Sequence, residues 1–149
     1  MDNAQLNLTV ASAGSSFSLG SSIPVEVKLT NVSSDSVWIN KRLGVGYEDS
    51  SIRELFFTVY DSFTREIIPA PETERVDVHR MPPARVDFDL LAPGASVGVA
   101  VDLSYWHRFG ENGHYEIVFT YQNEYDGHEF ELKAFTVELV SNPLTITVQ

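Results

Sequence analysis

The chain has 149 residues, no cysteine, and 21 acidic against 10 basic residues, for a formal net charge of −11. Such a surface repels phosphate backbones, so we expect no nucleic-acid partner. The lack of cysteine excludes disulfides, thiolate metal sites and cysteine nucleophiles. A chain of this length buries roughly two thirds of its unfolded surface, which is enough for one core. We therefore predict a single domain over residues 1–149.

Apolar and polar side chains alternate along much of the chain, with the two-residue period of a β-strand. In chain order, the predicted strands are Leu6–Val10, Ile23–Leu29, Val37–Asn40, Leu55–Asp61, Arg65–Ile68, Val86–Leu90, Val97–Val101, Tyr115–Tyr121 and Leu144–Val148. Only Leu103–Arg108 has room for a single helical turn. This pattern predicts an all-β fold, an antiparallel two-sheet sandwich of about 7–9 strands.

Asp126-Gly127 lies between two alternating runs and predicts a hairpin with a two-residue type I′ turn. In the returning run, Phe130 and Leu132 are out of phase with the apolar residues of 135–139. Since a one-residue shift reverses the two faces of a strand, we predict a β-bulge or strand break at Lys133-Ala134.

Acidic residues surround this turn: Glu124, Asp126, Glu129 and Glu131. With a two-residue turn, Glu124 and Glu129 would face each other, which is unfavourable unless a cation or base intervenes. Calcium needs six to eight converging oxygen ligands, and the spacing matches no known calcium loop. We therefore predict solvated acids between Glu124 and Glu131, and cation binding there stays open.

Catalytic motifs are missing from the sequence. The histidines, His79, His107, His114 and His128, have no metal-ligand spacing. The run that begins at His128 starts like a zinc-protease helix motif, but its fifth position is Leu132 and it follows a turn. There is no Gly-x-Ser-x-Gly elbow and no phosphate-binding glycine loop. We predict no catalytic residue, no metal site and no cofactor.

The segment Glu111–Ile117 resembles the Asp-x-Gly-x-Tyr-x-Cys segment of immunoglobulin domains. In that comparison Tyr115 is the tyrosine-corner residue, and Ile117 stands where the family has cysteine. Val27 and Trp38 have a spacing similar to that of the family's other cysteine and its core tryptophan, again without the cysteine. The resemblance implies an immunoglobulin-like topology.

A looser resemblance covers most of the chain, through Val25–Asn31, Leu90–Val97, Val101–Ser104, Phe109 and Gly113–Tyr115. These segments look like bacterial immunoglobulin-like accessory domains, the amino-terminal pro-domain of deuterolysin-type metalloproteases, and BsuPI-type proteinase-inhibitor domains. The resemblance implies a secreted accessory, pro-domain or inhibitor role, with a protein partner such as a protease.

The location of the protein stays open between two alternatives. Residues 1–5 lack the basic and apolar regions of a signal peptide, so the protein is either cytoplasmic or begins after a removed signal. The resemblance favours an extracellular or periplasmic location. No apolar run approaches the ~20 residues of a membrane helix, and we expect no membrane span.

The first candidate binding segment is the long connection from Pro69 to Arg85, because function in sandwiches usually lies on loops. Its candidate residues are Arg80, Met81, Pro82, Pro83 and Arg85. Consecutive prolines favour an extended backbone that loses little entropy on binding. The alternative is a plain crossover between sheets, with a short strand at Val76–Val78.

The second candidate segment is Tyr105–Arg108, where Tyr105 and Trp106 precede an arginine. Aromatic residues beside arginine are enriched at interaction hot spots. The alternative is that an aromatic side chain packs under the end of the sandwich.

Together these features predict a non-catalytic binding or accessory domain of a secreted or envelope protein, acting through surface loops. A protease pro-domain or proteinase inhibitor is the first alternative, and a glycan-binding module the second. The sequence does not decide the oligomeric state, and a dimer formed by edge-strand pairing stays open.

Overall fold

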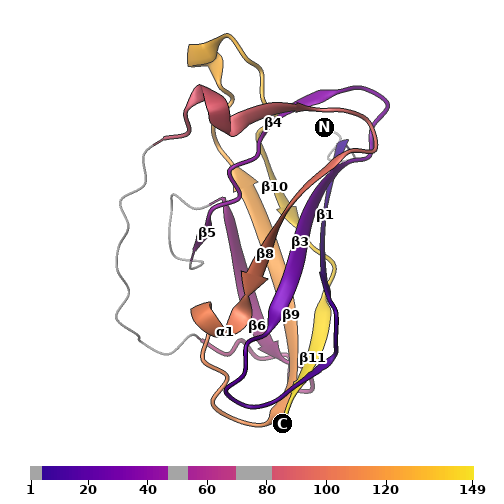
Figure 1. The fold of residues 1–149 in the computed structure, drawn as a ribbon, viewed down its shortest axis with the longest axis vertical. Coiled ribbons are helices and arrows are strands. Elements are labelled where there is room, and N and C mark those ends of the chain that lie inside the picture. The colour runs from indigo at the N-terminus through magenta and orange to yellow at the C-terminus, as the bar shows by residue number, and fades with distance from the viewer. Residues whose placement is uncertain (1–4, 47–53, 70–81) are drawn as a thin grey trace.

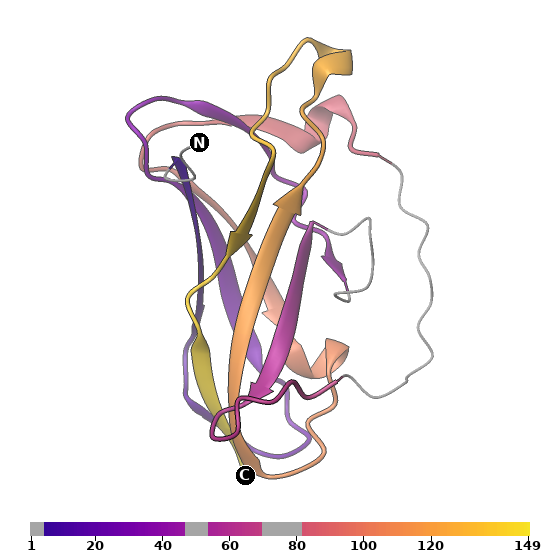
Figure 2. The ribbon, with the colours of Figure 1, turned by 180° about the vertical axis from the view of Figure 1, so that it is seen from behind.

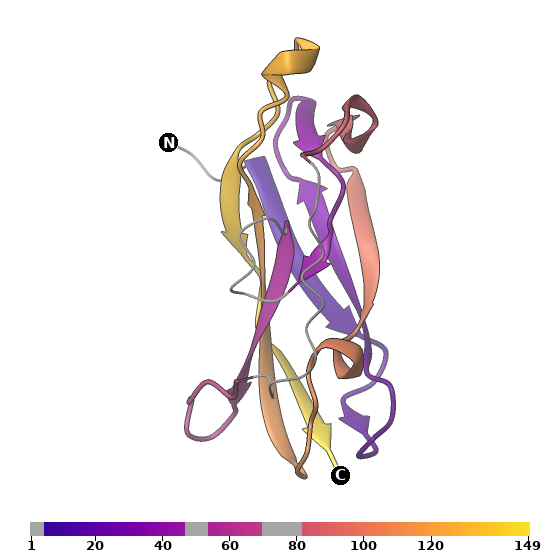
Figure 3. The ribbon, with the colours of Figure 1, turned by 90° about the vertical axis from the view of Figure 1, so that its left-hand side faces the viewer.

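A computed structural model describes residues 5–46, 54–69 and 82–149. The fold is an all-β sandwich, as predicted: a three-stranded sheet packs against a sheet of six strands, with a separate two-stranded ribbon near the top of Figure 1. The larger sheet is at the front when the molecule is seen from behind (Figure 2), and the side view shows the layers edge-on (Figure 3). Within the described residues, no helix is long and apolar enough to cross a membrane.

The smaller sheet consists of β1 (Leu6–Ser12), β3 (Pro24–Asn31) and β8 (Ser96–Asp102), antiparallel in the order β1-β3-β8. Its register places Val27 opposite both Val10 and Val99. The alternation seen in the sequence directs one face of each strand into the core, where Val27 and Leu29 are completely buried. The outward face is exposed at Glu26 and Lys28 and at the small residues of β8.

The larger sheet is built around β9 (Gly113–Asn123). On one side β9 pairs with β6 (Leu55–Asp61). On the other side it pairs with β11 (Leu144–Val148) and then with β10 (Val137–Val140). The two-residue strands β2 (Ser16–Phe17) and β5 (Val45–Gly46) pair with β11 and β6, respectively. Ile117, Phe119 and Tyr121 of β9 are completely buried and fill the space between the layers.

The ribbon consists of β4 (Val37–Asn40) and β7 (Phe88–Leu91), which follows a short 3₁₀ helix, η2 (Arg85–Asp87). Its Ile39 is completely buried in the core. Trp38, by contrast, is only half-buried, so it does not take the place of the core tryptophan to which its spacing was compared. The strand expected at Val86–Leu90 begins later, at Phe88, because the preceding residues coil into η2.

Two details of the tyrosine-corner prediction are visible in the structure. The Tyr115 hydroxyl donates a hydrogen bond to the Glu111 carbonyl at 2.7 Å, closing the turn that enters β9. Val27 and Ile117 are completely buried in opposite sheets, in the positions compared with the two cysteines. The predicted single helical turn is also present, as α1 (Leu103–Trp106).

The predicted two-residue turn at Asp126-Gly127 is wrong. Strand β9 ends at Asn123 and β10 begins at Val137, with the 3₁₀ helix η3 (His128–Phe130) between them. Gly127 does adopt a positive φ of 76°, but the Asp126 carboxylate accepts the His128 N–H at 3.0 Å and starts a helical turn instead. Glu124 and Glu129 are consequently not paired across a ladder.

The side chain of Asn123 closes the base of this loop. Its Nδ2 donates to the carbonyls of Tyr125 and Phe135, both at 2.9 Å. No regular ladder crosses Lys133-Ala134, as predicted, and Ala134 forms only an isolated bridge with Trp38. The expected strand before the break is absent, because residues 130–132 belong to the end of η3 and the turn after it.

Arg65–Ile68 was also predicted as a strand, but only Ile67 pairs, in an isolated bridge with Tyr60. Arg65 has a positive φ of 65°, which interrupts an extended backbone. Val76–Val78 lies outside the described residues.

Candidate functional site

The described part of the proline-containing loop exposes two of its candidate residues, Pro82 and Arg85. Arg80 and Met81 lie outside the described residues. Pro82 is exposed, but Pro83 is buried. The guanidinium of Arg85 lies over the Trp38 ring, 5.1 Å from its centroid. This cation–π contact holds Arg85 against the ribbon.

The second predicted segment is divided by the structure into one packed and one exposed aromatic residue. Tyr105 is 77% exposed. Trp106 is partly buried and packs against the core. The two rings meet edge to face, with centroids 5.2 Å apart and an interplanar angle of 80°. Trp106 therefore supports Tyr105, which presents its ring to solvent.

The backbone beneath Tyr105 is fixed by Asp102, the N-cap of α1. The Asp102 carboxylate accepts the Ser104 N–H at 3.0 Å, the Ser104 hydroxyl at 2.7 Å and the Ile23 N–H at 2.9 Å. Burial acts to raise the pKa of Asp102, but the hydrogen bonds from Ile23 and Ser104 outweigh it and hold the pKa below its ordinary value. The short helix is thus anchored to the start of β3.

A hollow of about 350 Å³ lies between α1 and the end of β8. It is lined by Val45, Ala100, Val101, Asp102, Tyr105 and Trp106. Most of these side chains are apolar, and Tyr105 forms one wall. We call this the α1 hollow.

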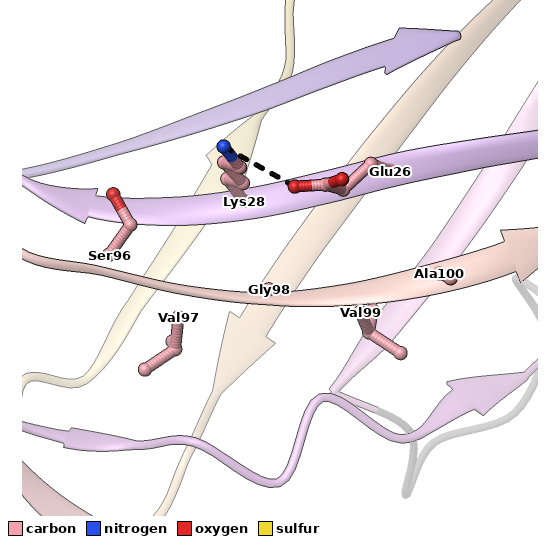
Figure 4. Close-up of a pocket in the computed structure, with 7 residues that line it drawn as sticks. All are labelled: Glu26, Lys28, Ser96, Val97, Gly98, Val99 and Ala100. Atoms are coloured by element: carbon pink, nitrogen blue, oxygen red, sulfur yellow. Dashed lines mark ion pairs between the residues drawn. The ribbon is translucent and has the colours of Figure 1, made fainter. Parts of the chain in front are cut away.

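A second hollow, of about 380 Å³, runs along β8 itself and is shown in Figure 4. The side chains of Val97 and Val99 lie on one side of the strand in that view. On the other side lie Glu26 and Lys28 of β3, whose charged groups form an ion pair at 3.3 Å. We call this the β8 groove; Ala100 belongs to both hollows.

The described histidines do not converge. His107 is buried beside Phe109, with ring centroids 4.7 Å apart, and burial lowers its pKa below the ordinary value. The His114 ring nitrogen is 3.0 Å from the Thr147 hydroxyl. His128 is exposed on η3, and its hydrogen bond to Asp126 and the charges of Asp126 and Glu129 raise its pKa. His79 lies outside the described residues.

In the described parts of the chain, Asp126, His128 and Glu129 form the one group of three side chains that could hold a metal ion. All three are exposed, and they provide a single histidine nitrogen with carboxylate oxygens. The His128 ring nitrogen is 2.7 Å from Asp126 Oδ1, so these two groups already satisfy each other. Nothing beyond this cluster indicates a bound cation in the part of the chain that the structure describes.

A buried ion pair at the end of the larger sheet has no signature in the sequence. Glu54 is 3% exposed, and its Oε2 accepts a hydrogen bond from Arg42 Nε at 3.0 Å, while Oε1 accepts the Gly44 N–H at 3.1 Å. Burial acts to lower the pKa of Arg42, but the hydrogen bond and the charge of Glu54 outweigh it and raise that pKa. The pair, together with the hydrogen bond from Gly44, fixes the segment between β4 and β5.

A comparison with protein-family models and a search of curated proteins both return no match to this chain. The candidate site is the joint surface formed by Tyr105, the α1 hollow and the β8 groove.

Proposed function

We propose that this chain is a non-catalytic binding domain that recognises a protein partner through the surface around α1 and β8. The observation that carries the proposal is Tyr105, a large aromatic side chain 77% exposed on a rigidly anchored helical turn. An exposed aromatic ring held in place costs little entropy when it is buried by a partner, which is typical of interaction hot spots. The adjoining α1 hollow gives a partner's side chain a place to insert.

The non-catalytic part of the proposal is supported by the arrangement of the titratable groups. His107 is buried next to an aromatic ring, and His114 and His128 lie near the two opposite ends of β9. The α1 hollow is lined mostly by apolar side chains and by Asp102, which already accepts three hydrogen bonds. In the β8 groove, the charged groups of Glu26 and Lys28 form an ion pair with each other at 3.3 Å. General acid–base chemistry needs a titratable group within hydrogen-bond reach of a substrate.

Selection of peptides from a displayed random library against the immobilised protein tests the proposal. We expect enriched peptides whose affinity falls at least tenfold in Tyr105→Ala. Phe63→Ala is the matched control, because Phe63 is an aromatic residue of similar exposure, 78%, whose ring packs on His114 of β9 and not on α1. Equal losses in both variants, or no enriched peptide, would contradict the proposal.

The same protein preparation separates the alternatives. Binding on a glycan array without binding to peptides would indicate a glycan module that stacks Tyr105 on a sugar. The resemblance to pro-domains and inhibitors motivates an inhibition assay with a secreted metalloprotease. If the chain inhibits the protease and Tyr105→Ala inhibits it equally well, the inhibitory surface lies on another loop.

A further inference from the structure

We infer that the outer edge of β8 binds an extended, basic segment of the partner, which adds to the three-stranded sheet as a fourth strand. This inference rests on the proposed function and names the part of the surface that would give most of the affinity. Main-chain hydrogen bonds to a sheet edge provide affinity in such complexes, and pockets for alternate side chains provide specificity.

The register shows which backbone groups of β8 are available. Asn31 donates its N–H to the Ala95 carbonyl. The register continues from this bond, so the odd-numbered residues of β3 and β8 are the ones that direct their N–H and C=O groups toward each other. In an antiparallel pair, neighbouring residues direct their N–H and C=O groups to opposite sides. The N–H and C=O groups of Ser96, Gly98 and Ala100 therefore point away from β3, and no described residue pairs with them as a strand.

Within the part of the chain that the structure describes, this edge lacks the usual protection against strand addition. Edge strands are normally blocked by charged residues, prolines, bulges or a covering segment. Residues 96–101 read Ser-Val-Gly-Val-Ala-Val, and their pairing with β3 has no bulge. The opposite edge of the same sheet differs, because the side chain of Asn142 hydrogen-bonds both backbone groups of Val10. Within the described residues, the β1 edge is thus partly blocked and the β8 edge is not.

The two hollows match the side-chain alternation of an added strand. Its inward side chains would lie over Val97 and Val99, which are core-facing but only partly buried because β8 is the last strand of its sheet. Further along the strand, one inward side chain would reach the α1 hollow beside Tyr105. The outward side chains would pass over Gly98 and Ala100, where small residues leave the β8 groove open (Figure 4).

Charge favours a basic partner over a second copy of this chain. With a net charge of −11, two copies repel each other, whereas a basic segment is attracted. The edge itself carries no charge between residues 96 and 101, so it presents no local obstacle to either occupant. In an extended segment that alternates basic and apolar residues, the basic side chains are attracted by the net negative charge and the apolar side chains fit the hollows.

A synthetic peptide of four Lys-Val repeats is a direct probe of this edge, measured at physiological salt against the full chain. We expect it to slow amide hydrogen exchange at Gly98 and Ala100, whose N–H groups would become hydrogen-bonded. The same peptide with alternate backbone nitrogens methylated keeps its charge and side chains but cannot form the ladder. It should bind at least tenfold more weakly, and this comparison does not depend on the folding of any variant.

Ala100→Pro removes one outward N–H and should weaken binding of the unmodified peptide at least tenfold, while Ala100→Gly keeps both the N–H and the open groove and serves as its control. Equal binding of the methylated peptide, or binding without protection at Gly98 and Ala100, would overturn strand addition. The proposed function would still stand if Tyr105→Ala weakened that binding. If the same two amides are already protected from exchange without peptide, and dilution of the protein removes that protection, the edge pairs with a second copy of the chain instead. Failure of every peptide to bind would reject both proposals.

Discussion

The side chain of Asn142 acts as a strand partner for Val10. Its Oδ1 accepts the Val10 N–H at 2.9 Å, and its Nδ2 donates to the Val10 carbonyl at 3.1 Å. Asn142 lies in the gap between β10 and β11, where the neighbouring Ser141 hydroxyl accepts the Phe119 N–H at 2.9 Å. The break between β10 and β11 therefore provides hydrogen-bond partners for two strands, β9 through Ser141 and β1 through Asn142. It joins the two layers at the edge of β1.

Replacing Asn142 with alanine should destabilise the protein by about 2 kcal/mol, since two hydrogen bonds worth about 1 kcal/mol each are lost. The variant should also aggregate faster, because the β1 edge becomes open to pairing. Urea unfolding and light scattering measure the two effects. Asn142→Asp places a carboxylate oxygen against the Val10 carbonyl oxygen in place of the donor, so it should be no more stable than the alanine variant. An unchanged alanine variant would contradict the role of this contact.

Gly98 of β8 has no room for a side chain on its β3 side. A Cβ built there would lie 2.9 Å from the Val27 carbonyl oxygen, closer than real Cβ atoms come. Gly98→Ala should therefore cost about 1–3 kcal/mol through displacement of the strand, despite the lower entropy of alanine in the unfolded chain. Gly14→Ala is the control, because nothing lies within 4 Å of the position that its methyl group would occupy. Chemical denaturation should show a loss in the first variant and none in the second.

Breaking the Arg42–Glu54 ion pair should strongly reduce the free energy of unfolding. The two side chains are only 14% and 4% exposed, so Glu54→Ala leaves a guanidinium charge largely out of water. We expect a loss of about 3–5 kcal/mol in unfolding free energy. The exposed pair Lys28–Glu26 provides the comparison, since Glu26→Ala should change stability by less than about 1 kcal/mol. Similar losses for the two alanine variants would show that burial does not govern the strength of these pairs.

His107 should make the protein less stable in mild acid. Burial lowers its pKa in the folded state, so the unfolded chain takes up a proton first as the pH falls below about 6.5. Stability then decreases with falling pH, by about 1.4 kcal/mol for each unit by which the two pKa values differ. Urea unfolding from neutral pH down to mild acid measures this slope, which His107→Leu should flatten.

His128 has the opposite effect and is the control for that experiment. Its pKa is raised in the folded state, mainly by its hydrogen bond to Asp126, so it adds stability below its unfolded pKa that is lost as the pH rises through the folded value. His128→Gln should therefore steepen the loss of stability in acid. A profile that His107→Leu leaves unchanged would assign the acid sensitivity to other groups.

The strands with clear alternation were predicted well, because burial of one face leaves a period-two record in the sequence. The bounds of β4, β6 and β11 match the predicted Val37–Asn40, Leu55–Asp61 and Leu144–Val148. Tyr115 was also recognisable, since its hydroxyl bonds a carbonyl only four residues upstream. The local pattern was sufficient where one face of a strand is buried, as in β4 and β6, and where the contact lies within one turn, as for Tyr115.

The incorrect predictions follow from side-chain contacts that the alternation of apolar and polar residues does not show. The loop after β9 is closed by Asn123 with Phe135 and by a bridge between Ala134 and Trp38, and these override the local preference of Asp126-Gly127 for a two-residue turn. The β8 edge was overlooked for a related reason. An uncharged run of small and β-branched residues has the same sequence pattern in a central strand as in an edge strand. Only the sheet order β1-β3-β8 shows that β8 is at the edge.

The distance along the chain between Val10 and Asn142 also affects how the protein is made. The two residues are 132 positions apart, although β1 and β3 can pair as soon as both have been synthesised. At translation rates of about 5–20 residues per second, the β1 edge stays open on the nascent chain for on the order of ten seconds. Each newly made molecule thus passes through a period in which the β1 edge is open to strand pairing.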